Sequence, residues 1–275
     1  MKSILMIELK RGFKNKTFFF SVLLGIVIGN IEFFKEVLPL ASKLEEYLAY
    51  DNPMNDISWL YANWLGGHLT SIYSYVFFLL LPVISILPFA TSGFEDIKSG
   101  FIKNITIRVD KGKYYFAKYI AVFVTGGTAV VLPLVFNLAL SATVLPSVLP
   151  QKNSSTFILY GTHIGTELFF SHPYLYIFLY LLFDFIFAGL IATLSLVVGY
   201  MAEHKFEVIF VPFIGYAFLN SVCNLLKNTE KSPMFFLRPG YGITDLKAVI
   251  FIGITVFVVT FVAYVLRGKK KDVIS

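Results

Sequence analysis

The sequence predicts an all-α integral membrane protein with six transmembrane helices, and three observations support this fold class. Of the 275 residues, 57% are hydrophobic and 15% are charged, and the mean hydropathy is +0.74, well above that of soluble domains. Six stretches are long and apolar enough to cross a hydrocarbon core of about 30 Å. Basic residues gather in alternate connections between these stretches, as they do in multi-pass membrane proteins.

Each predicted span is an apolar run close to the roughly 20 residues that a helix needs to cross a membrane. The spans cover residues 17–34, 71–91, 115–140, 174–200, 206–226 and 248–266, in a single transmembrane domain that extends over residues 1–275. Three longer connections lie between them, at residues 35–70, 141–173 and 227–247. The Pro and Gly residues of the last connection favour a segment that dips back into the membrane over a plain hairpin.

The distribution of basic residues predicts the orientation. Most of the 23 Lys and Arg residues flank the spans on the side of both termini, and such enrichment is typical of cytoplasmic flanks. We therefore expect both termini and the connection at residues 92–118 in the cytoplasm, and the three long connections outside. The Lys-, Ile- and Phe-rich composition favours a bacterial plasma membrane protein. Residues 1–16 suit a helix at the inner interface, and a plain basic flank is the alternative.

The connection at residues 92–118 is polar and basic, and it contains an amphipathic pattern. Ser92 followed by Glu95 is a capping-box pattern, which predicts a short helix that starts there. At 100° per residue, one narrow apolar stripe contains Phe94, Ile97, Phe101 and Ile105. The opposite side carries Asp96, Ser99 and Lys103. The pattern predicts either a docking helix or an ordinary amphipathic helix on the membrane surface.

Three features inside the spans are candidates for function. Asp184 is the one acid well inside an apolar run, and it is either a functional carboxylate or a hydrogen-bonded residue that faces the bundle. Asn220 and Asn224 make the outer half of the fifth span polar, where they line a substrate-accessible surface or pack against neighbours. Gly25 and Gly29 have GxxxG spacing, which favours a subunit contact or close internal packing.

Known catalytic and cofactor motifs are missing from the sequence. It contains no GxxxxGK[ST] phosphate loop, GxSxG elbow, HExxH pair or Cys/His metal cluster, and its single Cys223 excludes an intrachain disulfide. We therefore expect neither an enzyme nor a metal or cofactor on this chain. The net charge of +6 is explained by basic membrane flanks that face lipids, without a nucleic-acid partner.

The chain resembles the permease subunits of ABC exporters, the ABC type-2 transporter membrane family, over essentially its whole length. The resemblance is most specific in FEDIKSGFIKN at residues 94–104 and KYYFAK at residues 113–118, where Glu95, Gly100 and Lys118 match the family pattern. The segment ELKRGFKNKTFF at residues 8–19 looks like the family's connecting helix. The tripeptide at residues 109–111, Val-Asp-Lys, stands where the family has a Ser-Arg turn.

The resemblance implies a division of labour between subunits. Separate ATPase subunits, which carry ATP and Mg, are expected to bind the cytoplasmic face and to act through a short coupling helix between spans two and three. The residues that it assigns to this coupling are Phe94, Glu95, Ile97, Lys98, Gly100, Phe101 and Lys103. The apolar members would fill a groove on the ATPase, while the lysines would meet its acidic rim or lipid phosphates. A second permease copy, identical or related, is expected, with spans one and five at the interface.

The sequence therefore predicts a permease that exports a hydrophobic or amphipathic substrate, such as an antimicrobial peptide, a drug or a lipid. The alternative is a membrane-embedded immunity or sensor protein that binds a peptide toxin without transport. The two differ in their dependence on an ATPase partner.

Overall fold

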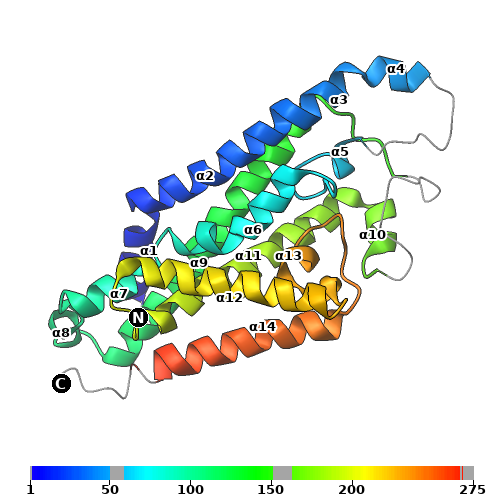
Figure 1. Ribbon diagram of the computed structural model, residues 1–275. Helices are drawn as coiled ribbons and strands as arrows, with labels where there is room; N and C mark the ends of the chain where they lie inside the picture. Colours follow the sequence, from blue (N-terminus) through cyan, green and yellow to red (C-terminus); the bar gives the residue numbers. More distant parts are fainter. Residues whose placement is uncertain (1, 50–58, 151–162, 267, 269–275) are drawn as a thin grey trace.

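The computed structural model describes residues 2–49, 59–150, 163–266 and 268, and its regular elements in these ranges are helices. Six helical stretches are long and apolar enough to cross a membrane, which confirms the predicted number of spans and places the chain among multi-pass membrane proteins. They run side by side as an elongated bundle (Figure 1). Their bounds are Lys16–Ser42, Ile72–Lys98, Lys111–Ser141, Pro173–Val198, Lys205–Leu225 and Leu246–Leu266.

The first two spans extend further than their hydropathy predicted, because extra helical turns follow the apolar run. The first consists of α2 (Lys16–Glu32), a π-helical turn η1 (Phe33–Val37) and α3 (Leu38–Ser42). The second begins with α6 (Ile72–Ile86) and ends with α7 (Thr91–Lys98). The serine at position 71 caps α6, since its hydroxyl accepts hydrogen bonds from two backbone amides of the first turn.

The fourth span, α11 (Pro173–Val198), lies at the centre of the bundle. It packs most extensively against α9 (Lys111–Ser141), and also against α6, α12 (Lys205–Leu225) and α14 (Leu246–Phe261). Glycines allow the close approach of α9 and α11: a Cβ atom on Gly126 would lie 2.5 Å from Ala192 Cβ, and one on Gly189 would lie 2.7 Å from the Phe123 ring. Large apolar side chains on the outer faces remain exposed, as lipid-facing surfaces require.

One end of the bundle carries α1 (Lys2–Phe13), which precedes α2 and packs against α9. We call this the α1 end. It also holds α7, α8 (Phe101–Thr106) and the π-helical turn η4 (Val262–Leu266) that ends the sixth span. Figure 1 shows α1, α7 and α8 gathered there. A separate helix before the first span was predicted from the sequence, and the structure contains it.

The opposite end, which we call the distal end, carries the long connections (Figure 1). Their short helices are α4 (Leu44–Ala49), α5 (Trp59–Ala62), α10 (Thr166–Ser171), η3 (Thr229–Lys231) and α13 (Pro233–Phe236). The segment with α13 folds back against the bundle, because Phe236 stacks edge-on against Phe187 of α11 with ring centroids 5.2 Å apart. The composition of the connection at residues 227–247 predicted that it is not a plain hairpin, and the structure agrees.

Candidate functional site

A buried cluster of charged side chains joins three helices at the α1 end. Lys118 of α9 lies between two carboxylates, with its Nζ 2.6 Å from Glu8 Oε2 of α1 and 2.6 Å from Asp96 Oδ2 of α7. The Lys118 and Glu8 side chains are fully buried and Asp96 is nearly so. These three residues form the centre of what we call the ion-pair cluster.

Other side chains complete the ion-pair cluster. The Arg11 guanidinium donates to Glu8 Oε1 at 2.8 Å and to Asp96 Oδ1 at 3.0 Å. The Tyr114 hydroxyl donates to Asp96 Oδ2 at 2.6 Å, and Lys118 Nζ donates to the Ser92 hydroxyl at 3.2 Å. Burial alone would lower the pKa of Arg11, but its hydrogen bond and charge contact with Asp96 outweigh that effect and raise it.

The charges of the ion-pair cluster balance, with two carboxylates facing one ammonium and one guanidinium. Buried charges are tolerated when each has a partner and the remaining lone pairs accept hydrogen bonds. Since the partners come from α1, α7 and α9, none of these helices can shift alone without leaving a buried charge unpaired. The cluster therefore couples the three helices mechanically.

The predicted single coupling helix is in fact two helices, α7 and α8, separated by Gly100. Gly100 has φ +70°, in the left-handed region that favours glycine, and this ends the α-helical path. The predicted capping box is also wrong, because α7 starts at Thr91 and the Ser92 hydroxyl donates to the carbonyl of Phe89. This hydroxyl is part of the ion-pair cluster instead.

The apolar stripe of the predicted coupling residues faces this chain, which corrects the expectation that it fills a groove on a partner. Phe94 is 8% exposed and packs with Ala202 and Val208 of the fourth-to-fifth connection and α12. Ile97 and Phe101 are half-buried against the core of the α1 end. Amphipathic spacing predicts a buried face correctly, but it does not say whether the burial is internal or against a partner.

The polar members of the predicted coupling set remain at the surface. Glu95 is exposed and pairs with Lys205 at the start of α12, while Lys98 and Lys103 are exposed. Ile107, just after α8, is 84% exposed and was not singled out from the sequence. A single exposed isoleucine is common on protein surfaces, and it is the position beside the exposed Lys103 at the end of α8 that makes Ile107 a candidate contact for a partner.

Asp184 lies in the core of the bundle, and its side chain is fully buried. Among the described residues, neither of its carboxylate oxygens has a hydrogen-bond partner. The alternative that Asp184 is a hydrogen-bonded packing residue is therefore not supported. An unpaired carboxylate at membrane depth is costly, and Asp184 therefore remains a candidate for function.

The two asparagines predicted near a substrate path lie in different surroundings. Asn220 is buried and accepts a hydrogen bond from the Ser232 hydroxyl at 2.9 Å, which ties α12 to the segment before α13. Asn224 is exposed at the end of α12. The interpretation of Asn220 as internal packing is thus favoured, and the pair does not form one polar surface with Asp184.

The GxxxG pair of the first span packs inside the chain and not against a second copy. A Cβ atom on Gly25 would lie 2.5 Å from the Pro133 ring of α9, and one on Gly29 would lie 3.2 Å from Asn137 Cβ. The predicted subunit contact at these glycines is therefore wrong, and the alternative of internal packing is correct. Other residues would have to form any interface between copies.

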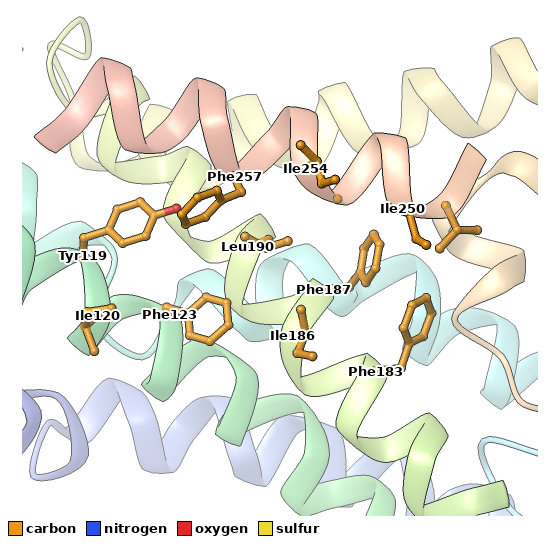
Figure 2. Close-up of a pocket in the computed structure, with 12 residues that line it drawn as sticks. Tyr119, Ile120, Phe123, Phe183, Ile186, Phe187, Leu190, Ile250, Ile254 and Phe257 are labelled. Atoms are coloured by element: carbon orange, nitrogen blue, oxygen red, sulfur yellow. The ribbon is translucent and has the colours of Figure 1, made fainter. Parts of the chain in front are cut away.

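An apolar groove of about 390 Å³ lies between α9, α11 and α14. Figure 2 shows its lining, with Phe183 and Phe187 of α11 on one side and Ile250 and Ile254 of α14 facing them. Gly253 of α14 also lines the groove and allows α14 to approach α11 closely, since a Cβ atom there would lie 3.2 Å from the Phe187 ring. Such a groove suits an acyl chain or an apolar side chain.

Sequence reasoning missed the ion-pair cluster, because Glu8 and Asp96 were not recognised as partners of Lys118. The available signal was charged residues among apolar neighbours in three segments, an acid and a cation in the first, an acid in the second and a cation in the third. Comparison with known proteins adds no guidance, since no family model, curated protein or solved structure matches this chain. The site must be interpreted from its own geometry.

Proposed function

We propose that this chain is the membrane-spanning permease subunit of an ATP-driven exporter, in which ATP and Mg²⁺ are bound by separate ATPase subunits. The observation that carries the proposal is the ion-pair cluster, which fastens α7, the end of the second span, to α1 and to α9 of the third span. The short helix α8 follows α7 directly. A force applied to α7 and α8 would then reach the bundle without being absorbed by a flexible loop.

The proposed contact with the ATPase is the exposed side of α7 and α8. Ile107 supplies an apolar anchor, and Lys98 and Lys103 supply positive charge for an acidic rim. Phe94 and Phe101 hold the two helices on the bundle and do not contact the partner. Arg11 strengthens this seat, because its guanidinium lies 4.9 Å from the centre of the Phe101 ring.

The proposed substrate is hydrophobic or amphipathic, such as an antimicrobial peptide, a drug or a lipid. The apolar groove between α9, α11 and α14 supports this class, since its lining offers apolar and aromatic surface at membrane depth. The proposal also assigns Asp184 of α11 to the substrate path, because neither of its buried carboxylate oxygens has a hydrogen-bond partner among the described residues. Export is outward from a bacterial plasma membrane with the α1 end in the cytoplasm, and two permease copies form one transporter.

The experiment is purification of the tagged full-length chain from membranes of its source in a mild detergent. We expect a co-purifying polypeptide with a Walker motif and ATP hydrolysis in the purified complex. Ile107→Asp should lower the recovered ATPase subunit by at least about tenfold, because loss of an interface anchor costs about 2 kcal/mol or more. Recovery is measured by quantitative immunoblotting or mass spectrometry.

The matched control is Met201→Asp, because Met201 is 85% exposed in the connection between α11 and α12 at the same end. It should recover the ATPase subunit at the unsubstituted level. The proposal would be contradicted if the chain were purified without any ATPase partner and still protected cells in the absence of such a partner. That result would favour a sensor or immunity protein.

A further inference from the structure

At the distal end, three side chains bring metal-ligand atoms together. Glu32 closes α2, Glu36 lies in the following π-helical turn η1, and His68 follows the short helix α5. One ligand atom from each lies within 4.8 Å of the other two. Glu32 and Glu36 are one helical turn apart and reach the same face, and π-helical turns recur at functional sites.

We propose that Glu32, Glu36 and His68 bind a divalent zinc ion. His68 Nδ1 lies 3.1 Å from Glu36 Oε2 and 3.4 Å from Glu32 Oε1. Ligands about 2.0–2.2 Å from a tetrahedral zinc ion lie about 3.3–3.6 Å from one another, so both distances from His68 are already close to the spacing that the ion requires. The ligand atoms of the two glutamates lie within 4.8 Å of each other. One imidazole with two carboxylates suits zinc better than calcium or magnesium, which prefer oxygen ligands alone.

The burial of Glu32 is a second, independent observation that points to a cation. Its side chain is fully buried, and in the described part of the chain its ion-pair partner is His68, at 3.4 Å. That distance is longer than the 2.7–2.9 Å typical of a charge-assisted hydrogen bond. At the α1 end, by contrast, the buried Glu8 has a lysine and an arginine at 2.6 and 2.8 Å. A bound cation would supply the compensation that Glu32 lacks.

Neighbouring side chains hold the ligands in place. Asn137 of α9 donates from Nδ2 to Glu32 Oε2 at 2.9 Å, which leaves Oε1 directed at His68. The same amide accepts from the backbone of Leu65 at 2.7 Å, which fixes the chain just before His68. The buried Arg238 donates to the carbonyl oxygens of His68 and the following residue at 2.9 and 3.0 Å. Such supporting hydrogen bonds are typical of metal sites.

The ion has a path to the site, and the site keeps an open coordination position. His68 is 20% exposed and Glu36 is 24% exposed, so the ligands are accessible from one side while Glu32 closes the other. Three protein ligands leave a fourth position for water or for a group on a bound molecule. The zinc site does not depend on the proposed ATPase contact, because α7 and α8 lie at the opposite end of the bundle (Figure 1).

The test measures zinc binding to the untagged full-length chain in lipid nanodiscs, after treatment with a chelator and by competition with a fluorescent zinc chelator. All proteins carry Cys223→Ser, which removes the natural thiol as a zinc ligand. We expect one zinc ion per chain. His68→Ala and Glu36→Gln should each weaken binding by more than about 100-fold, since even loss of a supporting hydrogen bond costs 10–100-fold.

Matched controls are His204→Ala and Glu45→Gln, which remove an exposed histidine and an exposed glutamate elsewhere and should leave zinc affinity unchanged. His68→Cys should retain zinc binding and gain affinity for cadmium, which favours thiolate ligands. Zinc should also raise the melting temperature of the Cys223→Ser parent protein but not that of His68→Ala. The conservative variant His68→Cys tests the ligand role even when His68→Ala or Glu36→Gln does not fold.

Absence of saturable zinc binding in the Cys223→Ser parent protein would overturn the proposal and leave an ordinary His–Glu ion pair. Zinc affinity in His68→Ala equal to that of the parent protein would overturn it as well. So would a His68→Cys variant whose affinity for cadmium does not rise. Binding of calcium in preference to zinc would reject the assigned ion.

Discussion

At the scale of single residues, this chain contains two kinds of buried acid. Glu8 and Asp96 are compensated by Lys118 and Arg11 within hydrogen-bonding distance. Asp184 has no partner among the described residues. A compensated charge fixes the positions of the helices that carry it. An uncompensated carboxylate lowers the stability of the fold, so its presence in the bundle needs another explanation. The two kinds therefore point to different roles, structural coupling for the first and function for the second.

Lys118 is the residue on which the ion-pair cluster depends most. Lys118→Ala would leave Arg11 as the only cation that pairs with the two carboxylates among the described residues, and removal of one partner from a buried ion pair costs about 3–5 kcal/mol. We expect a loss of unfolding free energy of that size in thermal or denaturant unfolding of the protein in detergent. Lys113→Ala, an exposed lysine in the first turn of the same helix, should change it by less than about 0.5 kcal/mol. Equal stability of the two variants would contradict the coupling role of the ion-pair cluster.

The residues of the candidate sites were predictable from the sequence only in part. Asp184 was predictable, because a carboxylate inside an apolar run is conspicuous without any knowledge of its neighbours. The contact between Glu8 and Lys118 was not predictable, because the two residues are far apart in the chain and the local sequence around one does not indicate the other. The same holds for His68, which is brought to Glu32 by the packing of a connection on the distal end.

At the scale of elements, glycines decide how closely the helices approach. The sequence indicated that Gly25 and Gly29 permit close packing, and this was correct, but it did not identify the helix that approaches. The structure places Pro133 of α9 against Gly25. Hydrophobic spacing has the same limit at α7, where it predicted a buried stripe and not what buries it. Periodicity reports the angular position of a side chain on its own helix and contains no information on the neighbour.

Gly25→Ala tests the internal packing of the first span. The added Cβ would lie 2.5 and 2.8 Å from two atoms of the rigid Pro133 ring, so α2 must move, and overpacking of this kind costs about 1–3 kcal/mol. The matched control is Gly215→Ala in α12, where an added Cβ meets no atom within 4 Å. The control should leave stability unchanged or raise it by up to about 1 kcal/mol. Thermal unfolding in detergent measures the stability of both variants. Unchanged stability of Gly25→Ala would mean that Pro133 does not pack against Gly25.

At the scale of the whole molecule, the number of spans was the most predictable property. Each span requires only a sufficiently long apolar run, and this is a local property of the sequence. The ends of the first two spans were less predictable, because η1 and α7 continue the helical path with residues of mixed polarity. The arrangement of spans around α11 depends on small residues at particular contacts, and the sequence does not reveal which contacts these are.

The orientation of the bundle in the membrane is the whole-molecule property that the proposed function requires. Counting of basic residues predicts the α1 end in the cytoplasm, where an ATPase could reach α7 and α8. Single cysteines in a Cys223→Ser background test it: Glu230→Cys at the distal end and Lys113→Cys at the α1 end, both exposed. A membrane-impermeant maleimide should label the first in intact cells and the second only after permeabilisation. The reverse pattern would put α7 and α8 outside the cell, where no ATP-driven partner could act on them.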